Sequence, residues 1–199
     1  MTVVSSVSLE PVGVVLAGGL GRRLGGAKGS AELFGRPLAA WVADALGEVV
    51  SEVVIAVKER VEVPALSGVA VWREPSQPVH PLAGIAWALS RVGEARDIVV
   101  CAVDLPFCVD AVRAVVAAAR AGAGREAAVV MAEGQPLLGV YRGSVAGALQ
   151  AAVEAGRPAR AVVAELGALV VPVPDPGRTL FNVNTVEDLA RAEAMVCGG

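Results

Sequence analysis

The sequence holds few of the residues from which zinc sites are built. It has a single histidine, His80, and three cysteines without C-x-x-C spacing, which are Cys101, Cys108 and Cys197. Structural zinc sites usually gather four such ligands at short spacings, so we expect no zinc site. Cys101 lies inside an apolar run, and we interpret it as a small buried hydrophobic residue.

The sequence also lacks an excess of charge of one sign. Its formal net charge is −3 at pH 7 with basic and acidic residues interspersed, which predicts neither a nucleic-acid-binding face nor a membrane-surface patch. No apolar run approaches the roughly 18 residues needed to cross a bilayer. Residues 1–11 lack the basic region and continuous apolar core of a secretion signal, so we expect a flexible N-terminal lead-in and a cytoplasmic protein.

The chain of 199 residues is long enough for one well-buried domain, and no stretch has the composition of a dividing linker. Short apolar runs typical of strands alternate with segments of helical periodicity. We therefore predict a single α/β domain over residues 1–199, Rossmann-like and doubly wound, with helices on both faces of a mostly parallel sheet and one antiparallel strand. The predicted strands include 12–17, 52–57, 69–72, 126–131, 137–141 and 169–172.

Residues 12–28, VGVVLAGGLGRRLGGAK, turn directly from a predicted strand into a glycine-rich basic loop. Residues 12–17 are short, β-branched and apolar, which is typical of a central parallel strand covered on both faces. The glycines that follow allow the backbone to approach a ligand and to point N–H groups at an anion. These glycines are Gly18, Gly19, Gly21, Gly25 and Gly26. The loop cations Arg22, Arg23 and Lys28 suit phosphate oxygens, so the loop is predicted to bind a polyanion.

Two common phosphate-binding motifs do not match this loop. A P-loop, G-x-x-x-x-G-K-[ST], would need lysine where Ala27 stands and a hydroxyl where Gly29 stands. A dinucleotide fingerprint, G-x-G-x-x-G with an acidic residue about 20 positions later, would need glycine at Leu24, and Asp44 falls in a predicted helix. A dehydrogenase is therefore a distant alternative. An ordinary strand-to-helix turn would not need so many glycines and cations.

The loop resembles that of the nucleotidyltransferases that make molybdenum cofactor dinucleotides. Their motif reads approximately L-A-G-G-x-S-x-R-M-G-x-D-K, followed by G-x-P-L; here residues 16–28 read LAGGLGRRLGGAK and residues 35–38 read GRPL. Gly21 replaces a common serine and Ala27 a common aspartate, so the contacts of those side chains must be absent or made otherwise. The resemblance implies that the nucleotide contacts Leu16, Ala17, Gly18, Gly19, Gly21, Arg23 and Lys28.

Residues 73–85, REPSQPVHPLAGI, form a proline-rich loop that runs into a predicted helix, and long loops in compact domains usually carry function. Residues 81–85 resemble the G-P-L-A-G-[IM] helix start of guanylyl-transferring relatives, with His80 where glycine is common. Relatives often have an acidic residue near the start of this loop that helps to recognise the base or ribose. Glu74 stands there, and the resemblance implies a nucleotide contact. For His80, an exposed or helix-capping position and a substrate contact both stay open.

Residues 97–107, DIVVCAVDLPF, read as an apolar strand that ends in a carboxylate and a proline. Ligands of open α/β sheets bind beyond the carboxyl ends of the strands, which places Asp104 on the same edge as the glycine loop. A carboxylate suits Mg²⁺, which fills its remaining positions with water and substrate phosphates. The segment resembles the family's C-D-x-P-[FY], whose aspartate holds magnesium and contacts the nucleotide. The alternative is that Asp104 caps the following turn.

Residues 180–189, LFNVNTVEDL, resemble the family's F-x-N-[IV]-N-T-P-E-[DE]-L segment. Thr185 is predicted to cap the last helix, with Asp188 as an imperfect capping-box partner. An amide offers a donor and an acceptor without charge. Asn184 is therefore a candidate for orienting phosphate or magnesium-bound water, and Asn182 for fixing the loop backbone.

The candidates for binding the anionic acceptor are Gln135, Arg157, Asn182 and Asn184. Gln135 lies in a predicted turn over 134–136, and a comparable Q/H-P segment of relatives faces the acceptor. Arg157 lies in the basic loop 156–160. Two alternatives stay open. Gln135 can simply pack in the turn, and Arg157 can be an ordinary surface residue.

Together these motifs resemble the molybdenum cofactor guanylyltransferase family over nearly the whole chain, and the resemblance implies a nucleotidyltransferase fold. It also implies Mg²⁺-dependent transfer of GMP from GTP to the terminal phosphate of molybdopterin or molybdenum cofactor, with release of pyrophosphate. The expected catalytic residues are Arg22, Lys28 and Asp104. The expected protein partners are molybdenum-insertion proteins and target enzymes.

Two further readings remain open. Cytidylyl-transferring relatives use CTP, tend to carry L-A-A-G and have no aspartate before their lysine, so Ala27 favours them whereas Gly18, Gly19 and residues 81–84 favour guanine. A nucleotide-binding relative without transfer activity would explain the substitutions at the family's positions. The presence of both Lys28 and Asp104 argues against such a relative.

Overall fold

The computed structural model describes residues 9–19, 22–24 and 26–197. Its centre is a seven-stranded sheet with the order β5-β4-β1-β6-β8-β7-β9. The strands are β1 (Val12–Leu16), β4 (Glu52–Lys58), β5 (Ala70–Glu74), β6 (Ile98–Ala102), β7 (Val129–Ala132), β8 (Gln135–Tyr141) and β9 (Leu169–Val171). Strand β8 pairs antiparallel with β6 and β7, and the other pairs are parallel. The predicted mostly parallel sheet with one antiparallel strand is confirmed.

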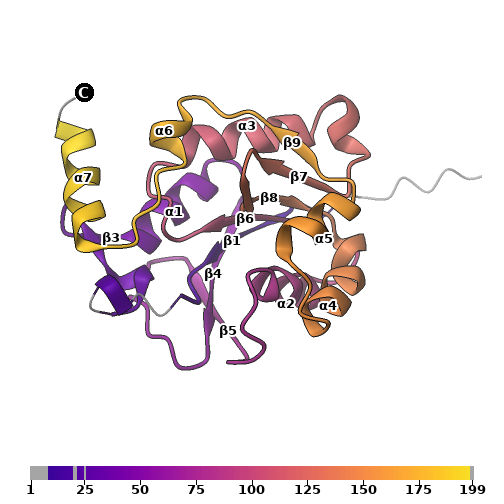
Figure 1. Cartoon of the computed structure of the whole chain (residues 1–199), viewed down its shortest axis with the longest axis horizontal. Helices are drawn as coiled ribbons and strands as arrows, with labels where there is room; N and C mark the ends of the chain where they lie inside the picture. Colours follow the sequence, from indigo (N-terminus) through magenta and orange to yellow (C-terminus); the bar gives the residue numbers. More distant parts are fainter. Residues whose placement is uncertain (1–8, 20–21, 25, 198–199) are drawn as a thin grey trace, which may run out of the picture.

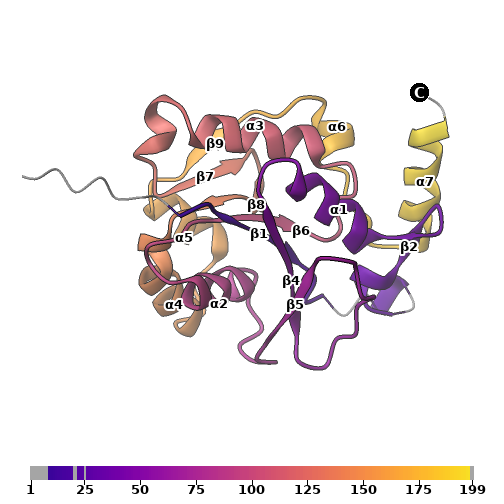
Figure 2. The same ribbon diagram turned by 180° about the vertical axis from the view of Figure 1, so that it is seen from behind.

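Helices cover both faces of this sheet (Figures 1 and 2). Helices α1 and α3 pack on one face, and α2, α4 and α5 pack on the other, each group over its own hydrophobic cluster. The helices are α1 (Leu38–Gly47), α2 (Ala83–Val92), α3 (Val109–Ala119), α4 (Ala146–Glu154), α5 (Ala159–Glu165), α6 (Pro176–Thr179) and α7 (Val186–Cys197). The doubly wound arrangement predicted from alternating strands and helices is therefore confirmed.

Strand β6 shows why the central strands read as unbroken apolar runs. Ile98 and Val100 point into the cluster beneath α2, whereas Val99 and Cys101 point into the cluster beneath α1 and α3. Because both faces of a covered parallel sheet are buried, every position of the strand favours an apolar side chain. The interpretation of Cys101 as a small buried residue is confirmed.

The carboxyl ends of the parallel strands gather the polar residues that the sequence motifs single out. Strand β1 runs into the glycine loop, and β6 runs into Asp104. Strands β4 and β5 end at Lys58 and Glu74, which face each other in the strand register. One edge of the sheet therefore presents all of these groups.

A small hairpin and the last helix lie beside this edge (Figure 1). Strands β2 (Glu32–Leu33) and β3 (Arg36–Pro37) are joined through Phe34 and Gly35, whose φ angles of 53° and 69° suit a type I′ turn. Helix α7 contacts β2, which brings the start of α7 close to the glycine loop. None of the helices in the described part of the chain has the length and apolar character needed to cross a membrane.

The predicted turn over 134–136 is displaced by one residue. Gly134 has a φ of 71° and forms the turn with Glu133, whereas Gln135 and Pro136 already belong to β8. The turn needs only the one left-handed residue that glycine supplies readily. The chain can therefore resume strand pairing directly after Gly134.

Candidate active site

Three segments that are far apart in the sequence meet through Lys28. Its Nζ lies 2.8 Å from Oδ2 of Asp104 and also donates to Oδ1 of Asn184. The side chains of Lys28 and Asp104 are 22% and 15% exposed, so the ion pair is accessible at one side only. The cluster joins the loop after β1, the loop after β6 and the segment before α7.

The backbone around Asp104 is fixed by two neighbouring segments. Val183 donates its N–H to the carbonyl oxygen of Asp104 at 2.8 Å, and Val103 donates to Leu16 at 3.1 Å. The following turn closes through the backbone bond from Leu105 to Ala102 at 3.3 Å. These bonds hold the carboxylate at the sheet edge without using its side-chain oxygens.

The carboxylate of Asp104 keeps one oxygen for a ligand. Oδ1 is buried and has no hydrogen-bond partner among the residues that the structure describes. Across the same residues, no group of three or more His, Cys, Asp and Glu side chains gathers as a metal site would require. A single carboxylate fits Mg²⁺, which binds through one or two carboxylates, water and substrate phosphates. The donor set is therefore compatible with magnesium brought in with a nucleotide.

The glycine loop lies against both Lys28 and Glu74. A Cβ on Gly19 would lie 3.4 Å from Cδ of Lys28, and a Cβ on Gly18 would lie 3.0 Å from Oε1 of Glu74. Ala17 donates to Ala56 on β4 at 2.8 Å, which fixes the start of the loop. The two glycines therefore leave room for charged side chains to approach the loop backbone.

The structure does not describe all of the glycine-loop residues that were predicted to contact the nucleotide. Gly21 is outside the described residues, and for Arg22 only the backbone is described, in a short 3-10 helix (Arg22–Leu24). Arg23 is exposed and Leu16 is half-buried. The phosphate contacts assigned to these residues from the sequence stay predictions.

A cavity of about 310 Å³ opens beside the loop and reaches from Leu16 and Gly18 to Glu74, Pro81 and Leu137. Burial raises the pKa of the Glu74 carboxyl, and the nearby Lys58 ammonium opposes that rise. Apolar walls with one buried carboxylate are typical of sites for small planar ligands. This lining makes the cavity a candidate site for the base end of a nucleotide.

Lys58 is the residue of this cavity that the sequence reasoning missed. Its Nζ lies 3.2 Å from Oε2 of Glu74. The sequence could have indicated Lys58, because it directly follows a predicted strand. It therefore lies at the carboxyl edge of the sheet, where ligands bind. Its partner could not be found from the sequence, since the two residues belong to different strands.

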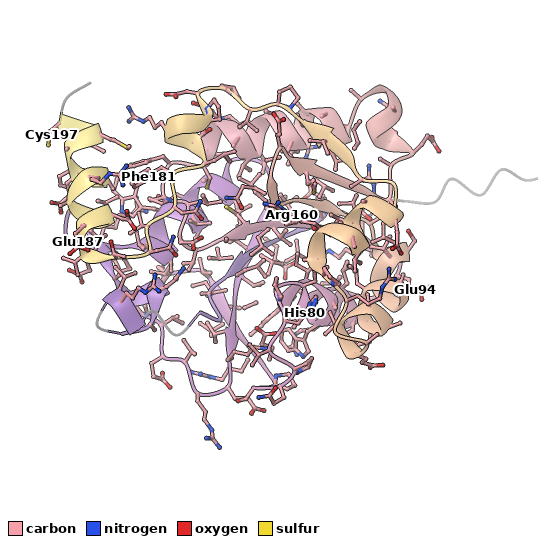
Figure 3. All side chains as sticks on the ribbon, viewed as in Figure 1. His80, Glu94, Arg160, Phe181, Glu187 and Cys197 are labelled. Atoms are coloured by element: carbon pink, nitrogen blue, oxygen red, sulfur yellow. The ribbon has the colours of Figure 1, made fainter. Side chains whose placement is uncertain are left out.

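His80 connects the rim of the cavity to the segment before α5 (Figure 3). Its Nδ1 accepts a hydrogen bond from the N–H of Leu82 at 3.1 Å, and Nε2 lies 2.7 Å from the carbonyl oxygen of Arg157. Since Nδ1 accepts, the proton sits on Nε2, which donates to Arg157. His80 thus holds Leu82, the residue that precedes α2, and because it also lines the cavity, a substrate contact stays a prediction.

A capping box fixes the segment that carries Asn184. Asp188 donates its N–H to Oγ1 of Thr185 at 3.2 Å, and its Oδ2 accepts from the N–H groups of Asn184 and Thr185, each at 3.1 Å. The bond from Asn184 is the main reason why the pKa of Asp188 lies below its ordinary value. This stabilisation is present above the ordinary aspartate pKa and is lost as the pH falls through the lowered value. The predicted cap at Thr185 is confirmed.

Removal of this cap is expected to weaken the fold slightly. Thr185→Ala deletes the acceptor for the Asp188 N–H and is expected to lower the free energy of unfolding by about 1 kcal/mol. Urea denaturation followed by circular dichroism measures the change, with the exposed Val186→Ala as a matched control. A Thr185→Ala protein as stable as the control would contradict the capping role.

The acceptor candidates are not gathered in one place. The guanidinium of Arg157 pairs with Glu165 on α5, which is the surface alternative left open for it. Asn182 donates to the carbonyl oxygen of Leu180 at 3.0 Å and holds the loop backbone. Gln135 begins β8, whose antiparallel pairing places it at the edge where β6 ends. Of the four candidates, Asn184 is the one that contacts Lys28.

A larger cavity of about 530 Å³ lies between α1, α3 and α6, with Arg36, Trp41 and Phe107 in its lining. Gly18 and Gly19 of the glycine loop line the smaller cavity, but neither lines this one. Size alone would favour this cavity, but phosphate chemistry needs the charged groups at the sheet edge. We therefore do not assign the nucleotide to it.

Comparison with known proteins identifies the family of the chain. Residues 13–171 match the family described as the MobA-like NTP transferase domain. The chain is 38% identical over 194 residues to the molybdenum cofactor guanylyltransferase of Cereibacter sphaeroides, with 92% of this chain and 96% of that protein covered.

Solved structures agree in fold. The molybdopterin-guanine dinucleotide biosynthesis protein A from Archaeoglobus fulgidus has a TM-score of 0.71 and 26% identity, with 94% of this chain and 100% of that chain covered. The 2-C-methyl-D-erythritol 4-phosphate cytidylyltransferase from Thermus thermophilus has a TM-score of 0.68 and 19% identity over 95% and 100%, a likeness of fold alone. The protein belongs to the family of MobA-like NTP transferases, as its four sequence motifs predicted.

Proposed function

We propose that this protein transfers GMP from GTP to the terminal phosphate of molybdopterin or molybdenum cofactor, giving the guanine dinucleotide cofactor and pyrophosphate. The observation that carries the proposal is the contact of Lys28 with both Asp104 and Asn184 beside the glycine loop. The likeness to a named guanylyltransferase over 92% of the chain supports it.

The acceptor itself supplies the nucleophile of this reaction. A phosphate monoester has a second pKa of about 6, so it is largely dianionic at pH 7. One of its oxygens forms a bond to the α-phosphorus of GTP, and the bond from that phosphorus to the pyrophosphate oxygen breaks. No protein base or covalent intermediate is needed. The enzyme has to align two anions that repel each other and to stabilise the leaving pyrophosphate.

The charged groups at the sheet edge suit that task. Lys28 provides an ammonium for the phosphates, and Asp104 and Asn184 hold it in position. Backbone N–H groups of the glycine loop supply further donors without added bulk. When bound, Mg²⁺ would neutralise phosphate charge, and Asp104 is the residue that would hold it. Arg22 is proposed as a second cation for the triphosphate.

The alternative CTP-dependent function is not favoured. The named relatives at 38% identity are guanylyltransferases, whereas the cytidylyltransferase likeness at 19% identity concerns the fold alone. The acceptor assay described below distinguishes an enzyme from a nucleotide-binding protein without transfer activity. The molybdenum-insertion proteins, target enzymes and cytoplasmic setting expected from the sequence stay predictions.

Thermal unfolding with Mg²⁺ and GTP, CTP, ATP or NAD in parallel tests the nucleotide. Ligand at about 100 times its Kd stabilises a protein by about 2.7 kcal/mol, which raises the Tm by roughly 5 to 10 °C for a chain of this size. GTP alone is expected to give this shift, and pyrophosphate release should then require molybdopterin. A shift with CTP alone, or GTP binding without any acceptor-dependent release, would overturn the proposal.

Lys28→Ala is expected to weaken GTP binding, because it removes the ammonium that contacts Asp104 and Asn184 beside the glycine loop. Loss of a charge-assisted hydrogen bond corresponds to roughly a tenfold or greater rise in Kd. Isothermal titration calorimetry with Mg²⁺ and GTP measures this, with the exposed Arg60→Ala as a control for net charge. An unchanged GTP affinity in Lys28→Ala would contradict the loop assignment.

A further inference from the structure

The chain contains two lysines, Lys28 and Lys58, whereas its other cationic side chains are arginines. Both lysines lie at the carboxyl edge of the sheet. Lys28 is assigned to the phosphates, but Lys58 has no part in the transfer reaction as described. Lys58 ends β4 and faces Glu74 at the end of β5, at the inner wall of the candidate base cavity.

The ammonium of Lys58 has a full set of acceptors. Its Nζ lies 3.2 Å from Oε2 of Glu74, and it donates to the carbonyl oxygens of Pro75 at 3.1 Å and Pro78 at 3.3 Å. An ammonium has three N–H groups, so these three acceptors leave none for a ligand. Lys58 can therefore act on a bound base only through Glu74 and the loop that follows it.

The second oxygen of Glu74 lies beside the glycine loop. Oε1 lies 3.0 Å from the place of a Cβ on Gly18 and 3.5 Å from that of a Cβ on Gly84. Two glycines thus make room for this oxygen, between the glycine loop and α2. Among the described residues Oε1 accepts no hydrogen bond, although the side chain of Glu74 is only 5% exposed.

The cavity around this oxygen suits a base better than a sugar. Leu16, Val79, Pro81 and Leu137 give it apolar walls, which fit a flat aromatic ring better than a sugar with several hydroxyls. Guanine carries two adjacent donors, N1–H and the N2 amino group. Adenine and cytosine instead place a ring acceptor beside their amino group, and that acceptor would face the carboxylate.

We propose that Lys58 is a positioning residue for guanine recognition, which fixes Glu74 so that Oε1 accepts hydrogen bonds from N1–H and the N2 amino group of guanine. The proposal rests on the proposed GTP-dependent function and identifies how its base is selected. In this proposal Lys58 acts on the base through Glu74 and does not contact the base itself.

The electrostatics of the pair explain why the lysine is needed. Burial raises the pKa of Glu74, and Lys58 opposes that rise. Without Lys58 the carboxyl would take up a proton at higher pH and present a donor to the donors of guanine. The other titratable group that lines the cavity is His80, which is unchanged in variants of Lys58 and therefore affects them and the wild type alike.

The test is Lys58→Met, which keeps the length of the side chain and removes its charge. Calorimetric titration with Mg²⁺ and GTP should show a roughly tenfold or greater rise in Kd. The ratio of variant to wild-type Kd should fall as the pH rises from about 6 to 8, because Glu74 ionises again. The preference for GTP over ITP, which lacks the N2 amino group, should shrink towards one.

Two further variants separate this role from a structural one. Arg73→Met removes the neighbouring cation on β5, whose guanidinium donates to the carbonyl oxygens of Glu59 and Val61, and should leave the GTP-to-ITP preference unchanged. In a Glu74→Gln background, Lys58→Met should cause no further loss of affinity.

The outcomes distinguish this proposal from the function on which it rests. Wild-type protein that does not bind GTP would overturn the proposed function itself. Wild-type binding with an unchanged affinity in Lys58→Met would overturn the role of Lys58 alone. A loss of affinity in Lys58→Met that is equal for GTP and ITP and independent of pH would also overturn the role of Lys58. A lysine with a merely structural role would give that result.

Discussion

Replacement of Asp104 by alanine is expected to lower kcat for GMP transfer by at least about 10²-fold, the usual effect of removing one electrostatic element from a phosphoryl or acyl transfer site. The carboxylate is the acidic partner of Lys28, at 2.8 Å, and its Oδ1 is the buried oxygen left without a partner among the described residues. The variant loses both the proposed magnesium ligand and the anchor of Lys28. Pyrophosphate release with saturating GTP and acceptor measures the loss.

Two controls make this result specific to the charge. Asp104→Asn keeps the size of the side chain and should lose nearly as much activity as Asp104→Ala. Asp110→Ala removes an exposed carboxylate on α3 that pairs with Arg113, and should keep full activity. Both Asp104 variants should unfold near the wild-type temperature, because Asp104 is held at the edge by the backbone bond from Val183. Full activity in Asp104→Ala would remove the residue from the proposed metal site.

Arg142→Ala is expected to lower the free energy of unfolding by about 3 to 5 kcal/mol, as when one partner of a largely buried ion pair is removed. The guanidinium pairs with Asp97 at 2.7 Å and donates to the carbonyl oxygens of Ala119 at 2.9 Å and Gly124 at 2.8 Å. It thereby ties the end of β8 to the turn after α3 and to the residue that precedes β6. Alanine would leave Oδ2 of Asp97 and these carbonyl groups without the guanidinium, while Oδ1 of Asp97 would keep the N–H of Gly143 at 3.1 Å.

Urea denaturation measures this loss, with Arg113→Ala as the comparison. Arg113 also makes ion pairs, with Asp110 and with Glu48, but its side chain is more than half exposed, so its removal should cost no more than about 1 kcal/mol. GTP affinity should be preserved in Arg142→Ala where the protein is folded, because Asp97 lies at the opposite end of β6 from Asp104. A cost as small as that of Arg113→Ala would contradict the role of Arg142 as a structural tie.

Most of the fold follows from local patterns in the chain. The unbroken apolar run within residues 97–107 predicted a strand, and the structure has β6 (Ile98–Ala102) there. The same kind of pattern places the glycine loop after β1 and Asp104 after β6 on one edge, since parallel strands share the direction of their carboxyl ends. The capping box of Thr185 and Asp188 could also be predicted, because its two residues are close in the sequence.

Other features depend on contacts that no local pattern records. Lys28 meets Asn184 across 156 positions, and His80 meets Arg157 across 77. The strand order and register decide that Lys58 faces Glu74, and the pairing of Arg157 with Glu165 decides that this arginine turns towards α5. Contacts between residues so far apart in the sequence follow from how the helices pack on the sheet.

The chain by itself thus established the kinds of groups at the site and the edge on which they lie, because strand periodicity, glycine loops and helix caps are set by neighbouring residues. The tertiary structure decided which of these groups touch: the pairing of Lys28 with Asp104, and of Lys58 with Glu74. The physical reason is that a charged side chain is positioned by its nearest partner in space. That partner is supplied by packing and register between segments far apart in the sequence.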